Sequence, residues 1–219
     1  MIDIELIINS LPLLLRGSQV TLQISVIGCF SGIFFGTILG LLQSGKNKII
    51  RSLVALYATI IRGTPMLIQI AFAAYVLPEL GLKLPLFWSA VLAISLNSAA
   101  YVSQIIRSGI SSVSSGQLEA ARTLGMSNMQ ITRYIVLPQA FRVVLPALGN
   151  EFITLVKDSS LASTIGVVEL TKEAWFIRSR TFDALSIYCA VAIIYLVMTT
   201  TLSIIIAQLE KKMSRHVKT

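Results

Sequence analysis

Seven ionisable or amide side chains in the apolar stretches of this chain are candidate functional residues. Two are bases and two are acids, so their formal charges cancel. Polar groups in such surroundings are costly, and they ordinarily line a polar cavity or pair with one another. The chemistry they offer is therefore recognition of a polar group or internal ion pairing. The seven residues are Arg62, Gln69, Asn97, Gln104, Glu151, Lys157 and Asp158.

The residue types needed for metal binding or nucleophilic catalysis are scarce. Cys29 and Cys189 both fall in apolar stretches, where a thiol behaves as a small apolar residue, and His216 lies in a basic tail. This set assembles neither a zinc site nor a His-based nucleophile, and it does not predict a disulfide. A Ser–Lys pair made by Lys157 and the serines after it remains the one formal catalytic arrangement.

The composition indicates what must position these side chains. Of 219 residues, 55% are apolar and 13% are charged, about half the roughly 25% typical of soluble domains. Three runs, 17–45, 84–106 and 184–209, contain no charge and exceed the roughly 20 residues with which a helix crosses a bilayer. The sequence predicts an all-α polytopic membrane protein, and its net charge of +8 does not indicate nucleic-acid binding.

Two less uniform apolar runs complete the predicted membrane domain. The first is interrupted by Arg62-Gly63-Thr64-Pro65, and the second carries Lys157 and Asp158. We expect five transmembrane helices in a single domain over residues 1–219. Their expected bounds are 17–45, 53–77, 84–106, 143–168 and 184–209.

The distribution of bases predicts the orientation of the chain. Five spans place the termini on opposite faces, and Lys and Arg accumulate on the cytoplasmic side. Segments 44–53 and 107–142 and the C-terminal tail together hold eleven bases and two acids. The first sixteen residues and the expected loops 79–83 and 169–183 hold five bases and six acids. The C-terminus is therefore expected in the cytoplasm and the N-terminus outside.

Four glycines of the first run recur every fourth residue and so lie on one helix face. Small residues at this spacing let helix backbones approach closely in lipid. Packing within the chain is the favoured interpretation, and a subunit interface is the alternative. The glycines are Gly28, Gly32, Gly36 and Gly40.

The polar segment 107–142 has the pattern of two short helices. Two serines can cap a helix-favouring stretch that ends at Gly125, a common terminating residue. A second helix can begin near Ser127, with Gln130 in a capping-box position, and is expected to run to Leu137-Pro138. The sequence predicts that both helices project at the cytoplasmic face.

This loop contains Glu119-Ala120-Ala121, then Gly125, then Ile135-Val136-Leu137-Pro138. The pattern resembles the EAA loop of ABC importer permeases, which docks into a groove on the cytoplasmic ATPase. Other stretches are similar to signatures of the polar amino-acid permeases of that family, and they occur in the family's order over roughly residues 15–210. They are Arg62-Gly63-Thr64-Pro65, Asn97-Ser98-Ala99-Ala100-Tyr101, Arg107-Ser108-Gly109-Ile110 and Lys157-Asp158-Ser159-Ser160-Leu161.

The resemblance implies a fold like that of type I ABC importers, with a cytoplasmic coupling helix in the loop. Arg62, expected at the cytoplasmic end of the second span, would have a gating or structural role together with Gly63, Pro65 and Lys157. The residues that would couple to the ATPase are Glu119, Ala120, Ala121, Gly125, Leu137 and Pro138.

The resemblance also implies the partners. The chain has no Gly-x-x-x-x-Gly-Lys-Ser/Thr phosphate loop, so it is not expected to be an enzyme or to bind a cofactor, and ATP and Mg²⁺ would belong to separate ATPase subunits. An extracytoplasmic binding protein would deliver the ligand. A second permease subunit, identical or different, would complete the pathway in a bacterial inner membrane.

The implied substrate is a polar amino acid, moved inward by alternating access. A zwitterion in a low-dielectric cavity needs donors for its carboxylate and acceptors for its ammonium. A helix break at Lys157-Asp158-Ser159-Ser160 would free such groups. An acid facing a cationic side chain gives a weak preference for arginine, histidine or lysine, although either acid can instead pair with Lys157. The expected contact residues are Asn97, Asp158, Ser159, Ser160 and Glu151.

Three alternatives stay open. Glutamine, glutamate or another polar solute would suit the same cavity. A channel or secondary carrier would need a self-contained pathway and often shows inverted repeats, which this sequence lacks. A membrane-embedded enzyme would have to rely on the Ser–Lys pair.

Overall fold

The computed structural model describes residues 2–215, in which every regular element is a helix. The long elements are α1 (Ile4–Ser44), α2 (Lys48–Arg62), α5 (Leu86–Ser111), α8 (Leu137–Asp158) and α10 (Ala184–Arg215). The short ones are α3 (Met66–Ala71), η1 (Phe72–Val76), α4 (Leu77–Glu79), α6 (Ser115–Thr123), α7 (Asn128–Ile131), η2 (Thr132–Val136), η3 (Ser159–Ile165) and α9 (Leu170–Thr181).

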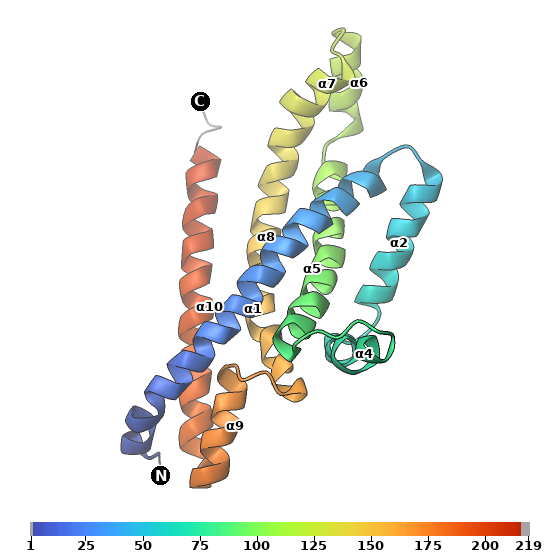
Figure 1. Cartoon of the computed structure of the whole chain (residues 1–219). Coiled ribbons are helices and arrows are strands. Elements are labelled where there is room, and N and C mark those ends of the chain that lie inside the picture. Colours follow the sequence, from blue (N-terminus) through green and yellow to red (C-terminus); the bar gives the residue numbers. More distant parts are fainter. Residues whose placement is uncertain (1, 216–219) are drawn as a thin grey trace.

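The long helices alternate in direction through one bundle (Figure 1). Among the described residues, four helical stretches are long and apolar enough to span a membrane, and α2 with the helices after it forms a fifth that is bent by 99°. The turn 45–47, the α6–α7 pair and the end of α10 share one end of the bundle, whereas the start of α1 and α9 lie at the other (Figure 1). The predicted all-helical membrane fold is confirmed.

The first span is longer than predicted. It begins at Ile4 rather than at residue 17, because the Asp3 carboxylate caps it by accepting a hydrogen bond from the Leu6 N–H at 2.9 Å. Its 41 residues extend about 60 Å at 1.5 Å per residue, twice the ~30 Å hydrocarbon core. The helix therefore tilts or extends beyond that core.

The glycine face of α1 packs against α5. A Cβ added at Gly28 would lie 2.6 Å from the Ile94 Cγ2, and one at Gly36 would lie 2.6 Å from the Val102 Cβ. At these positions only a glycine allows the observed approach of the two helices. The prediction that the stripe packs within the chain is confirmed.

The second predicted span breaks in its middle. α2 ends at Arg62, and α3 starts after Pro65, whose ring removes one N–H donor. Arg62 lies at the end of α2 far from the turn 45–47 (Figure 1). Under the predicted orientation, which places that turn in the cytoplasm, Arg62 does not sit at the cytoplasmic end of this span. The reason is that α2 already begins at Lys48 and runs fifteen residues before the break.

Three connections also differ from prediction. The expected loop 169–183 contains α9, which begins at a capped position and occupies most of that stretch. The expected segment 107–142 is shorter, because α5 continues to Ser111. The second helix of that segment does not end at Leu137-Pro138: the π turn η2 joins α7 to α8, with the Leu137 N–H bonded to the Thr132 carbonyl. This wider turn accommodates Pro138, which has no N–H to donate.

Candidate functional site

The α6–α7 pair is built around a tight turn at Gly125. Gly125 has φ +77°, its N–H donates to the Arg122 carbonyl at 2.9 Å, and the Met126 N–H donates to the Ala121 carbonyl at 3.1 Å. This pair of bonds is the Schellman termination, which places a left-handed residue after a helix. The predicted sharp turn is therefore present, and it depends on a conformation that glycine adopts without cost.

The second helix of the pair begins where the sequence predicts. Ser127 and Gln130 form a reciprocal capping box, with the Ser127 N–H donating to the Gln130 side chain at 2.8 Å. Gln139 donates to Gln117 at 2.8 Å and ties α8 to α6. These bonds hold the pair as a compact projection at the tip of the bundle (Figure 1).

The projection presents an apolar surface. Leu124, Met129 and Tyr134 are 81%, 78% and 64% exposed. Sequence reasoning passed over them, although large apolar side chains in an otherwise polar loop were a signal for a docking surface. Of the expected coupling residues, Ala121 is buried beneath the surface, whereas Glu119, Ala120, Gly125, Leu137 and Pro138 are exposed.

An amide network occupies the broken second span. The Gln69 side chain donates to the Ile61 carbonyl at 2.6 Å and to the Thr64 hydroxyl at 2.8 Å. Asn97, only 6% exposed, donates in turn to the Gln69 amide oxygen at 2.9 Å. The network satisfies backbone groups that the break leaves free, so it joins α2, α3 and α5. Asn97 thus has a structural partner, and Gln69 is the residue at the centre.

The remaining residues of the break face outward. Arg62, Gly63 and Pro65 are exposed, and the Arg62 guanidinium lies 5.1 Å from the centre of the Tyr101 ring on α5. A cation at this distance from an aromatic face is attracted to it. This contact links the bend to α5.

Two carboxylates lie seven residues apart on α8 and share one face of the helix. Glu151 and Asp158 interact electrostatically with each other, and Glu151 also faces Cys29 of α1 and Ser98 of α5. The Ser98 hydroxyl is buried and makes no hydrogen bond to a described group. Glu151 and Asp158 are each half-buried. In the described part of the chain neither acid forms a salt bridge, and Lys157 beside them is exposed.

The predicted break after Lys157 is a change of helix type. α8 tightens into the 3₁₀ turn η3 at Ser159, and Gly166 ends that turn with φ +98°. Ser159 is fully buried and donates to the Val156 carbonyl at 2.8 Å, so its hydroxyl is already used, while Ser160 is half-buried. The structure thus places Glu151 and Asp158 on α8 and Ser160 in the turn that follows it, and it gives Asn97 a partner on α3.

A buried acid that the sequence did not single out joins three helices. Glu169 is fully buried and caps α9 by accepting from the Lys172 N–H at 2.9 Å. Thr21 of α1 and Tyr195 of α10 each donate to its other oxygen at 3.2 Å. Its partners lie far away in the sequence, so no local pattern could have revealed the network.

Comparisons with known proteins show the family of this chain. Residues 32–215 match the family described as "Binding-protein-dependent transport system inner membrane component". The chain belongs to this family. The permease is therefore a multi-pass protein of the inner membrane and the membrane component of its transport system, not the ATPase.

Relatives resemble the permease over nearly its whole length. It is 39% identical to the glutamine transport system permease protein GlnP of Escherichia coli (strain K12), over 93% of this chain and 94% of that protein. It is 35% identical to the arginine transport system permease protein ArtQ of Bacillus subtilis (strain 168), over 98% and 99%. The solved structure described as an amino acid ABC transporter with histidines covers 97% of the permease and 99% of its own chain, with 38% identity and TM-score 0.91.

Proposed function

We propose that the permease forms half of the membrane pathway of an ATP-driven importer for polar amino acids. Relatives named for glutamine and arginine transport, and a structure described with histidines, support this substrate class. A separate ATPase supplies the energy, an extracytoplasmic binding protein delivers the amino acid, and a second permease subunit completes the pathway.

We further propose that a cationic amino acid, such as arginine, histidine or lysine, is the preferred substrate. The carrying observation is the pair of half-buried acids on α8, Glu151 and Asp158, neither of which forms a salt bridge among the described residues, although Lys157 lies next to Asp158 in the chain. Two carboxylates without a salt bridge in a low-dielectric path favour a positively charged ligand. The buried Ser98 hydroxyl beside Glu151 offers one further polar contact.

The coupling surface follows from the same architecture. The exposed apolar residues of the α6–α7 projection would enter a groove on the ATPase, and the continuous helix from α7 into α8 would carry the motion to Asp158. The projection shares its end of the bundle with the turn 45–47 and the end of α10 (Figure 1). Because these segments hold the excess of bases, this end is the cytoplasmic one under the positive-inside rule.

Ligand-stimulated ATP hydrolysis tests the proposed substrate. The permease is reconstituted with its ATPase and binding protein and is screened with arginine, histidine, lysine, glutamine and glutamate. We expect the cationic amino acids to stimulate hydrolysis most. Stimulation by glutamine or glutamate alone would refute the assignment of a cationic ligand, and stimulation by none would refute the substrate class.

The variant Asp158→Asn tests the role of the carboxylates. Removing one charge from the path is expected to raise the KM for arginine about tenfold, equivalent to about 1.4 kcal/mol, and to affect glutamine much less. Glu79→Gln, which removes an exposed acid outside the path, is the matched control. Equal losses in both variants, or for both substrates, would argue against contact with the cationic group.

A further inference from the structure

A basic pocket lies at the end of the bundle that carries α6 and α7, between α1, α2 and α5. It has a volume of about 360 Å³, and each of the three helices contributes to its wall. Its cations, Lys48, Arg51 and Arg107, come from two different helices. No acid lines it. The lining residues are Gln43, Lys48, Arg51, Ser52, Ala55 and Arg107.

The polar groups of this pocket are left unsatisfied by the described part of the chain. The three bases form no salt bridge there and are exposed. Gln43 is only 5% exposed; its amide oxygen accepts from Gln104 at 2.9 Å, and its amide nitrogen has no hydrogen-bond partner among the described groups. Three positive charges and an amide N–H group thus surround a space that suits an anion.

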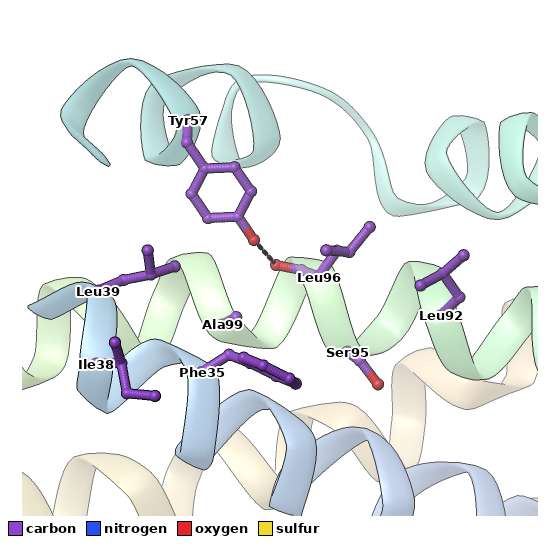
Figure 2. Close-up of a pocket in the computed structure, with 8 residues that line it drawn as sticks. All are labelled: Phe35, Ile38, Leu39, Tyr57, Leu92, Ser95, Leu96 and Ala99. Atoms are coloured by element: carbon purple, nitrogen blue, oxygen red, sulfur yellow. Dashed lines mark hydrogen bonds between the residues drawn. The ribbon is translucent and has the colours of Figure 1, made fainter. Parts of the chain in front are cut away.

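A second cavity lies between the same three helices. It has a volume of about 320 Å³ and is walled by apolar side chains, among them Phe35 and Ile38 of α1 and Leu92 of α5 (Figure 2). The Tyr57 hydroxyl in its wall donates to the Leu96 carbonyl at 2.6 Å, and Ser95 contributes a second hydroxyl. On α1 the nearest residues of the two cavities, Leu39 and Gln43, are four positions apart, about 6 Å along the helix axis.

We propose that the two cavities form a binding site for an anionic glycerophospholipid, with the phosphate between Lys48, Arg51 and Arg107 and an acyl chain in the apolar cavity. Basic pockets between transmembrane helices on the cytoplasmic side are suited to anionic headgroups. The adjoining apolar cavity favours a lipid over a soluble phosphate, because a free anion would leave it empty. The site involves neither Glu151 nor Asp158 and does not depend on the transported solute.

The test measures lipid binding to the purified transporter complex in neutral detergent by native mass spectrometry. Dioleoylphosphatidylglycerol, dioleoylphosphatidylcholine and water-soluble glycerophosphoglycerol are titrated in separate arms. Each neutralised base is expected to weaken phosphatidylglycerol binding about fivefold, so Lys48→Gln/Arg51→Gln/Arg107→Gln should lose about a hundredfold. Arg142→Gln/Lys211→Gln/Lys212→Gln removes three exposed bases outside the pocket and should bind as the wild type does.

Further variants distinguish the contribution of the headgroup from that of the acyl chain and from misfolding. Arg51→Lys/Arg107→Lys keeps both charges and should retain phosphatidylglycerol binding. If the triple Gln variant does not fold, the single variants Arg51→Gln and Arg107→Gln test the expected loss of about fivefold in phosphatidylglycerol binding per base. Ser95→Phe fills the apolar cavity. It should weaken the binding of phosphatidylglycerol but not the binding of glycerophosphoglycerol, which has no acyl chain. Equal binding of the two lipids, equal loss in the control triple, or equal affinity for glycerophosphoglycerol and phosphatidylglycerol would overturn the proposal.

Discussion

At the residue scale, Glu169 holds α1, α9 and α10 together through three hydrogen bonds to its carboxylate. Replacing it with alanine removes the cap of α9 and leaves the Thr21 and Tyr195 hydroxyls without their carboxylate partner. We expect Glu169→Ala to cost about 2–4 kcal/mol of unfolding free energy, from a lost cap and unsatisfied buried groups. Thermal denaturation in detergent measures it, with Glu173→Ala on the same helix as control. Equal melting temperatures would contradict this role.

The same residue predicts a pH dependence. Burial raises the pKa of the Glu169 carboxyl above its ordinary value, although hydrogen bonds from Lys172, Tyr195 and Thr21 oppose the shift. The folded state therefore holds its proton at a pH where the unfolded chain has lost it. The stability contributed by this group is present below the ordinary carboxyl pKa and falls as pH rises through the raised pKa. As the pH rises through the raised pKa, the melting temperature of the wild type should fall relative to that of Glu169→Gln. Parallel curves of melting temperature against pH for the two proteins would contradict the prediction.

A substitution at Gly125 tests the proposed coupling between ATP hydrolysis and uptake. An aspartate there would occupy a left-handed conformation at a cost of about 1–2 kcal/mol and place a charge beside exposed Leu124. Nothing lies within 4 Å of its added Cβ, so the protein should still fold and insert. We expect Gly125→Asp to retain ATP hydrolysis while uptake falls at least about tenfold. Gly116→Asp, in the same loop, is the control, and normal ATP-driven uptake by Gly125→Asp would remove the role assigned to this turn.

At the element scale, the contact of α1 with α5 depends on the absence of side chains at four positions. A Cβ at Gly36 would lie 2.8 Å from the Ala99 carbonyl oxygen, a backbone atom that cannot move aside alone. Gly36→Leu should therefore cost at least the about 1–3 kcal/mol of ordinary overpacking. Phe34→Leu, at a 61% exposed position of the same helix, should cost little. Similar melting temperatures for the two variants would show that the helices separate easily.

Elements were predictable where a local pattern fixes them. Apolar runs revealed the spans, the glycine spacing revealed the face of α1 that packs, and the spacing of Ser127 and Gln130 revealed the start of α7. The π turn before Pro138 and the helix α9 were missed because both depend on tertiary packing. α9, for example, is capped by a residue whose hydroxyl partners lie 148 and 26 positions away.

At the scale of the whole molecule, the net charge of +8 is a consequence of topology. The end of the bundle with the turn 45–47 and the α6–α7 projection carries most of the excess bases, and the two ends of the described chain lie at opposite ends of the bundle (Figure 1). The sequence predicted this division of charge because it needs only segment lengths and residue types. It could not place Asn97 against Gln69, since which face of α5 meets α3 is decided by packing.

In the proposed function acids line the pathway and the α6–α7 projection docks on the ATPase, but the described residues include no phosphate loop. Transport should therefore be strictly dependent on a partner ATPase. The most direct measurement is uptake of radiolabelled arginine into proteoliposomes containing the permease, its ATPase and its binding protein. We predict uptake that requires ATP and is lost without the ATPase; uptake at the same rate by the permease alone would contradict an ATP-driven importer and favour a channel or secondary carrier.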